Sequence, residues 1–176
     1  MLIEALKKRK FLVKKAEDYT KLVRENCAIP STENPKFGTE DEQRTQIQAW
    51  IQGHTDILKE ISKLNVAIQK TNLETNLTIQ LQDKAVTKNL SEWILRGREL
   101  ASLEYKMWEG ITDRGIKETK IPGPTRESQP IEVKIIRFYD PKLREEMRMA
   151  LLEEPSIVTA AMEIANATTP LIGYDE

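Results

Sequence analysis

The sequence predicts a mainly α-helical protein, built as an elongated antiparallel helical bundle or coiled coil of about four helices with one β-hairpin. Three observations favour this class. Charged residues make up 31% of the 176-residue chain and glycines number only 7, a composition typical of long exposed helices. Apolar side chains recur every three or four residues over long stretches, and one late segment alternates with a period of two. We expect a single elongated domain over residues 1–176, with the hairpin inserted at about 116–139.

The first helix is expected over residues 2–28. Its apolar side chains, such as Leu2, Leu6 and Val13, follow an alternating four-and-three spacing. Pro30 ends the helix, because proline has no backbone N–H to donate and restricts the residue before it. Residues 29–38 contain two prolines and one glycine, which favours a loop.

The second helix, Thr39 to Asn72, carries the most regular pattern of the chain. Thr39 and Glu42 match a capping box, in which each side chain accepts a hydrogen bond from the other residue's backbone N–H. A seam then repeats with a three-and-four rhythm, which favours coiled-coil packing. At 1.5 Å per residue the helix is roughly 50 Å long, which predicts an elongated molecule. The seam consists of Ile47, Trp50, His54, Ile57, Ile61, Leu64, Ile68 and Thr71.

Residues 72–82 are interpreted as a connection, because their Asn and Thr side chains favour caps and turns. A third helix is expected over residues 83–109, with Leu90 and Trp93 on its apolar face. Gly97 lies inside this helix at a cost of about 1 kcal/mol relative to alanine. It either permits a close helix contact or is simply tolerated.

A β-hairpin is expected from residues 116–121 and 131–139, joined by a proline-rich loop over 122–130. In its second strand Ile131, Val133 and Ile135 alternate with charged residues. An isolated two-stranded hairpin is marginal in water. The strands should therefore contact the chain's own helices or another chain, with Ile135 and Phe138 as candidate contacts.

The last helix begins at Asp140 and Pro141, since aspartate is a good N-cap and proline is favoured at the first helical position. Pro155 is expected to kink or restart this helix, and residues 168–170 end it.

Two helix ends are similar in sequence, and we call this similarity the 94-residue echo. A shift of 94 residues aligns residues 58–77 with 152–171. Two similar helix ends packed side by side would explain the agreement, and so would chance similarity between two amphipathic helices. The identical pairs are Leu58/Leu152, Glu60/Glu154, Ala67/Ala161, Asn72/Asn166, Thr75/Thr169 and Leu77/Leu171.

Short motifs spread over most of the chain resemble a small bacterial family described as septicolysin-like. Residues 2–9 are similar to its Leu/Ala-Glu-Ala-Leu-x-x-Arg/Lys opening, and residues 68–72 to an Ile-x-x-Thr-Asn segment at the end of its second helix. The extended residues 131–140 and Asn166 also match, whereas Pro155 and the loop 122–130 depart from the pattern. The resemblance implies a mainly helical architecture. The family label also implies a cytolysin, although no feature of this sequence supports membrane lysis.

The sequence predicts no catalytic residue, no metal site and no cofactor. His54 is the only histidine and lies on the apolar seam, so a core or interface position is the simpler interpretation. Cys27, the only cysteine, lies near a helix C-terminus, where the dipole disfavours a thiolate. No metal-ligand spacing, phosphate-binding glycine loop or convincing carboxylate pair occurs.

Charge and hydropathy limit the partners. The 27 basic and 28 acidic residues nearly cancel, so no nucleic-acid partner is expected. The basic residues of segment 7–15 form either a solvated helix face or a contact for an acidic partner or anionic lipid. We expect no signal peptide and no transmembrane segment, which favours a cytoplasmic or virion location.

The function that these observations favour is that of a non-enzymatic structural or interaction subunit. It would self-associate as a homo-oligomer or dock in a larger assembly, and a phage virion or tail component is one context that suits it. The alternatives are a membrane-active or lipid-binding cytolysin-like protein and a hydrolase or regulator whose site forms between two chains. The candidate interface residues are Trp50, His54, Ile61, Trp93, Trp108, Ile135 and Phe138.

Overall fold

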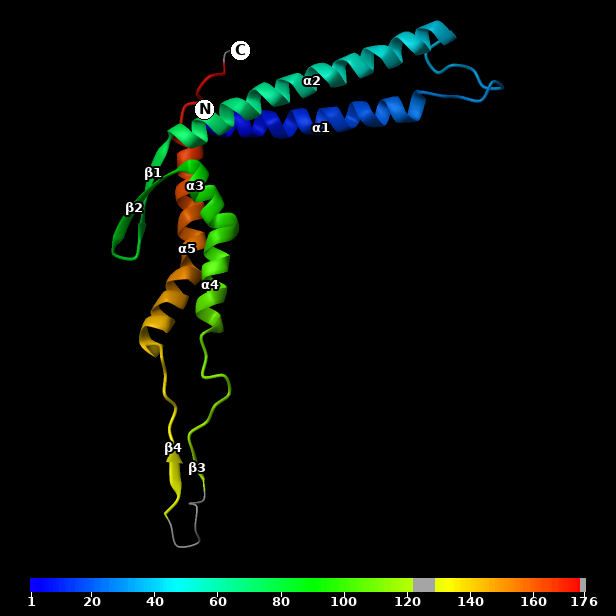
Figure 1. The fold of residues 1–176 in the computed structure, drawn as a ribbon. Helices are drawn as coiled ribbons and strands as arrows, with labels where there is room; N and C mark the ends of the chain where they lie inside the picture. Colours follow the sequence, from blue (N-terminus) through cyan, green and yellow to red (C-terminus); the bar gives the residue numbers. More distant parts are fainter. Residues whose placement is uncertain (122–128, 175–176) are drawn as a thin grey trace. The chain divides into compact units, whose positions relative to one another are not determined.

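The computed structural model describes residues 1–121 and 129–174 and is mainly helical, as the sequence predicts. The chain divides into two compact units. The first contains Met1–Leu77, Asn89–Ser91 and Met162–Glu176, and the second contains Thr78–Lys88 and Glu92–Ala161. The elements, labelled in Figure 1, are α1 (Leu2–Asn26), α2 (Glu40–Glu74), β1 (Asn76–Leu81), β2 (Lys84–Asn89), α3 (Leu90–Leu95), the π-helical segment η1 (Arg96–Leu100), α4 (Ala101–Gly110), β3 (Thr119–Ile121), β4 (Ile131–Val133) and α5 (Pro141–Thr168).

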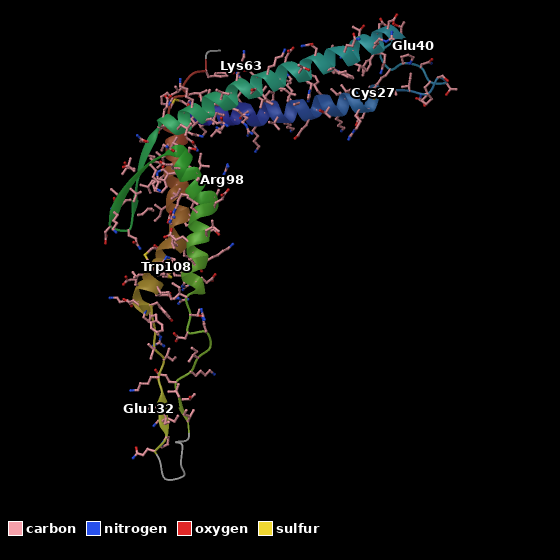
Figure 2. All side chains as sticks on the ribbon, in the orientation of Figure 1. Cys27, Glu40, Lys63, Arg98, Trp108 and Glu132 are labelled. Carbon is pink, nitrogen blue, oxygen red and sulfur yellow. The ribbon has the colours of Figure 1, made fainter. Side chains whose placement is uncertain are left out.

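Helices α1 and α2 lie side by side in opposite directions in the first unit (Figure 1). Figure 2 shows Cys27, just after α1, and Glu40, the first residue of α2, at the same end of this pair. The capping box is confirmed: Thr39 N donates to Glu42 Oε2 at 2.7 Å, and Glu42 N donates to Thr39 Oγ1 at 3.3 Å.

The seam of α2 is turned toward the interior, as the heptad pattern predicts. Ile57, Leu64, Ile68 and Thr71 are buried, and the other four seam residues are half-buried. The core of the first unit joins this seam to the apolar face of α1. Its buried members are Leu2, Ala5, Leu12, Ala16, Ile57, Leu64, Ile68, Leu90 and Ala165.

The ends of α2 and α5 make matching hydrogen bonds. Leu90 N donates to the carbonyl of Thr75 at 3.0 Å, and Leu2 N donates to the carbonyl of Thr169 at 2.9 Å. Thr71 Oγ1 also accepts a bond from Ile172 N at 2.9 Å, so the two ends are close together. The two helix ends that share the 94-residue echo thus each bind the first backbone N–H of another helix.

The expected connection at 72–82 and the expected helix start at residue 83 are both wrong. Residues 76–89 form a second hairpin, β1–β2, and the third helix begins only at Leu90. Alternate β1 side chains point inward, with Ile79 buried and Leu81 half-buried. Gln82 adopts the left-handed conformation, with φ of 53°, in the tight turn. The described residues therefore contain two short hairpins rather than one.

From Leu90 to Gly110 the third helix is continuous, with one wider turn at η1. Gly97 lies in this wider turn, and a Cβ atom there would be 4.0 Å from Val158 Cγ1. This is an ordinary contact distance, so the glycine is tolerated rather than required for a close approach.

Helix α5 begins as expected, since Lys142 N donates to the Asp140 side chain at 2.8 Å. It continues through Pro155 without a restart and ends at Thr168. Strands β3 and β4 pair antiparallel with Ile121 opposite Ile131, which confirms the position of the predicted hairpin. Its strands have three residues each, shorter than expected. Residues 122–128 of the predicted loop lie outside the described part.

Candidate interaction site

The segment after α4 runs beside the segment before α5, both in the second unit (Figure 1). A groove lies between these two segments. Its volume is about 500 Å³. Residues 110–116 form one wall and residues 135–139 the other, so the site stands at the base of the β3–β4 hairpin. We call it the hairpin-base groove. Ile135 and Phe138, two of the candidate interface residues, line it.

One carboxylate connects the two walls. Arg137 Nε and Nη2 donate to the two oxygens of Asp113 at 2.9 and 2.7 Å, and Tyr139 OH donates to Oδ1 at 2.8 Å. The hydrogen bond from Arg137 is the largest cause of a lowered pKa for Asp113, followed by that from Tyr139. The hydrogen bond to Asp113 raises the pKa of Tyr139. Two-point binding of this kind fixes direction as well as distance.

The turn that carries Asp113 explains how this side chain reaches the other wall. Ile116 N donates to the carbonyl of Asp113 at 3.0 Å. Arg114 and Gly115 have φ values of 53° and 74°, a left-handed conformation that suits glycine and reverses the chain. The backbone therefore turns back immediately after Asp113 and presents it toward Arg137.

Large apolar side chains line the same groove as this ion pair, and two of them are mostly exposed. Phe138 is 96% exposed and Ile136 is 77% exposed, whereas Ile111 and Ile135 are half-buried. Exposed aromatic and aliphatic groups next to a fixed polar network are typical of protein-binding surfaces. Both oxygens of the Asp113 carboxylate already accept hydrogen bonds, two from Arg137 and one from Tyr139.

Arg144 holds the adjacent end of α4. Its Nε donates to the carbonyl of Trp108 and its Nη2 to that of Glu109, both at 3.3 Å. A cation at a helix C-terminus satisfies carbonyls that lack intrahelical partners. Trp108, labelled in Figure 2, is half-buried, and its buried Nε1 has no hydrogen-bond partner among the described residues.

The other candidate interface residues lie elsewhere. Trp93 is 1% exposed and contributes to packing, while Ile61 is half-buried against the core of the first unit. His54 is half-buried on α2. Trp50 is half-buried and meets Phe37 edge to face, with ring centroids 5.4 Å apart.

Sequence reasoning missed Asp113, Arg137 and Tyr139. The alternation of Arg137 and Tyr139 placed them on one face of an extended segment, but Asp113 is 24 residues away from Arg137. A single acidic residue in a turn carries no signal that identifies its partner. In the basic segment 7–15, Lys8 is paired with Glu60 at 3.2 Å, so part of this segment serves the protein's own packing.

Comparison with known protein families, with curated proteins and with solved structures finds no match to this chain. Within residues 1–121 and 129–174, no cluster of three His, Cys, Asp or Glu side chains could hold a metal ion. None of the helices in the described part is both long and apolar enough to cross a membrane.

Proposed function

We propose that the chain is a non-enzymatic interaction subunit that self-associates or docks in a larger assembly through the hairpin-base groove. The observation that carries this proposal is the exposure of Phe138 and Ile136 beside the Asp113–Arg137 pair. Full burial of one such side chain contributes about 1.5–3 kcal/mol relative to exposure. Association with a partner that buries both Phe138 and Ile136 is stabilised by this free energy, because both side chains are exposed in the isolated chain.

Rigidity supports the same proposal. The Arg137 and Tyr139 side chains flank Phe138 in the sequence, and both donate to Asp113. The backbone that carries Phe138 is thus tied on both sides. Such preorganisation lowers the ordering cost that binding must overcome.

Helices α1 and α2 run side by side in opposite directions, which is compatible with an antiparallel bundle or coiled coil. This arrangement is part of the proposal. A homo-oligomer in the cytoplasm and a component of a virion or tail both suit an interaction subunit. The septicolysin-like resemblance, based on short motifs, adds a mainly helical architecture but no activity.

A second candidate function rests on helix α1. Phe11 is 63% exposed and follows Lys10 in the basic segment 7–15, an arrangement that suits contact with anionic lipid. A leakage assay on vesicles that contain phosphatidylserine distinguishes this membrane-active alternative. Release of dye by the wild type, and its loss in Phe11→Ser, would favour the alternative over the proposed function.

The proposal is tested by particle mass. Light scattering at micromolar concentration should give a mass above that of the monomer for the wild type, and a lower mass for Phe138→Ser. The matched control is Phe11→Ser, which removes an exposed phenylalanine from α1 and should leave the mass unchanged. A monomeric wild type, or equal masses for wild type and Phe138→Ser, would contradict self-association through this groove.

A further inference from the structure

Helix α1 packs against α2, and the continuous helix from Leu90 to Gly110 packs against α5. These two helix pairs repeat one another at the level of single side chains. Leu2 opens α1 and Leu90 opens α3, and both are 0% exposed. Along α2 and α5, residues 94 positions apart are also buried in the same way, as with Ile57 and Leu151 or Leu64 and Val158. The sequence echo therefore extends to the packing of each helix pair.

The ion pair that crosses each helix pair is repeated as well. Lys8 meets Glu60 at 3.2 Å in the first unit, and Arg96 meets Glu154 at 2.6 Å in the second. Each cation is the sixth residue after the leucine that opens its helix, and the two glutamates are the echo pair. Two equivalent sites can thus be compared within one chain.

In the first unit Tyr174 contacts both members of the Lys8–Glu60 ion pair. Tyr174 OH accepts a hydrogen bond from Lys8 Nζ at 2.8 Å and donates one to Glu60 Oε1. The Lys8 ammonium also lies 5.0 Å from the centre of the Tyr174 ring. The hydrogen bond from Tyr174 is the largest cause of the lowered pKa of Glu60. This site shows what chemistry such a pair accepts: an aromatic ring with a hydroxyl donor.

In the second unit the equivalent position is open. The 94-residue shift aligns Gln80 of β1 with Tyr174 in the sequence. Gln80 is exposed, on the face of the strand opposite Ile79, and it lines a groove of about 390 Å³. Gln80, Leu81, Arg96, Glu104, Leu151 and Glu154 are among its lining residues. The volume falls within the range of about 300–1,000 Å³ that is typical of ligand sites.

The polar side of this groove has spare acceptors. Arg96 donates to both oxygens of Glu154 at 2.6 and 2.7 Å and to Glu104 Oε2 at 2.6 Å. Two carboxylates therefore share one guanidinium, and the cluster of three carries a net negative charge. A carboxylate oxygen has about two lone-pair positions, so the shared oxygens can still accept from a hydroxyl group.

We propose that this groove binds a tyrosine side chain presented by a partner protein. The ring lies against Leu81 and Leu151, and the hydroxyl donates to the Glu104 or Glu154 carboxylate, as Tyr174 does to Glu60 within the chain. Phenylalanine fills the same volume but leaves the desolvated carboxylates without the added donor. Phosphotyrosine is rejected, because the groove lining carries three carboxylates, Glu104, Glu153 and Glu154, against two cations, Arg96 and Lys84, so a doubly charged phosphate meets a net negative surface.

This proposal does not depend on the hairpin-base groove, because the two grooves are lined by different residues. Either proposal can be wrong while the other holds. The test uses the full-length protein and N-acetyltyrosinamide as the probe, followed by NMR of the Arg96 Nε–H signal. We expect a saturable shift at millimolar probe. N-acetylphenylalaninamide should bind about tenfold more weakly, the effect of one hydrogen bond to a charged acceptor. The phosphotyrosine analogue should cause no saturable shift.

Gln80→Tyr provides the decisive variant, because it places in the second unit the residue type that the first unit already carries. It should abolish probe binding and raise the melting temperature. Thr78→Tyr, on the same strand but outside the groove lining, should bind the probe like the wild type. Absence of a saturable shift, equal affinity for the phenylalanine analogue, or unchanged binding in a folded Gln80→Tyr protein would each overturn the proposal.

Discussion

Arg96→Met should destabilise the second unit strongly, because two carboxylates share this one guanidinium. The Arg96 side chain is 20% exposed and serves Glu154, which is 7% exposed, and Glu104, which is 36% exposed. The hydrogen bond to Glu154 is the main cause of a raised pKa for the guanidinium, so Arg96 stays charged. Methionine keeps most of the apolar stem but leaves a buried carboxylate without a cation.

The size of the expected loss in the free energy of unfolding follows from this geometry. Removal of one partner from a buried ion pair costs about 3–5 kcal/mol in the free energy of unfolding. Because the Glu104 side chain is 36% exposed and keeps part of its hydration, we expect the low end, about 3 kcal/mol. For a chain of this length that lowers the melting temperature by roughly 6–12 °C.

Urea denaturation followed by circular dichroism and tryptophan fluorescence measures the loss. The double variant Arg96→Met with Glu154→Met should recover most of it, since apolar replacement of both partners removes the unpaired charge. Lys8→Met is the matched control at the equivalent pair, where the lysine is 41% exposed, and it should cost less. A loss under about 1 kcal/mol for Arg96→Met, the range of surface pairs, would refute the reasoning.

Three further outcomes are expected. Ile61→Asp should lower the melting temperature strongly, because Ile61 packs against the core and a buried unpaired carboxylate costs several kcal/mol; an unchanged value would show that the seam faces solvent. Ile135→Lys should weaken association or stability, since Ile135 lines the hairpin-base groove. If neither the particle mass nor the melting temperature changes, the hairpin makes no stabilising contact and this prediction is wrong. The pKa of Asp113 is lower in the folded protein than in the unfolded chain. The contribution of this carboxylate to stability is therefore complete at a pH above the ordinary pKa of aspartate. It is lost as the pH falls through the lower pKa of the folded state. The Arg137 Nε–H signal should therefore report loss of the contact only at pH values below the ordinary pKa of aspartate, and Asp113→Asn should remove this pH dependence.

Local signals explain why α2 was predicted well. Its start depends on Thr39 and Glu42, which are three residues apart, and its buried face depends on a repeat within one helix. Both signals are complete in the sequence, because the interacting groups are neighbours along the chain. The burial of Leu64 and Thr71, each 0% exposed, confirms the predicted phase of the seam.

The β1–β2 hairpin was missed for the opposite reason. The alternation of Leu77, Ile79 and Leu81 is only five residues long, and Val86 also fits a helical pattern that continues into Leu90. An isolated pair of short strands is marginal, so its stability comes from the surface on which it packs. In the folded chain Ile79 is 3% exposed, a burial that the short alternation in the sequence does not reveal.

By itself the sequence determined the helical class, the capped start of α2, the phase of its seam and the start of α5 at Asp140. Tertiary structure alone decided which charged and polar side chains meet. Asp113 and Arg137 are 24 residues apart, Arg96 and Glu154 are 58 apart, and Lys8 and Tyr174 are 166 apart. Helix periodicity and capping are short-range properties of the backbone, whereas the partner of a charge depends on how distant segments pack. In a chain with 27 basic and 28 acidic residues, the number of conceivable pairs is too large for composition or spacing to select the few that form.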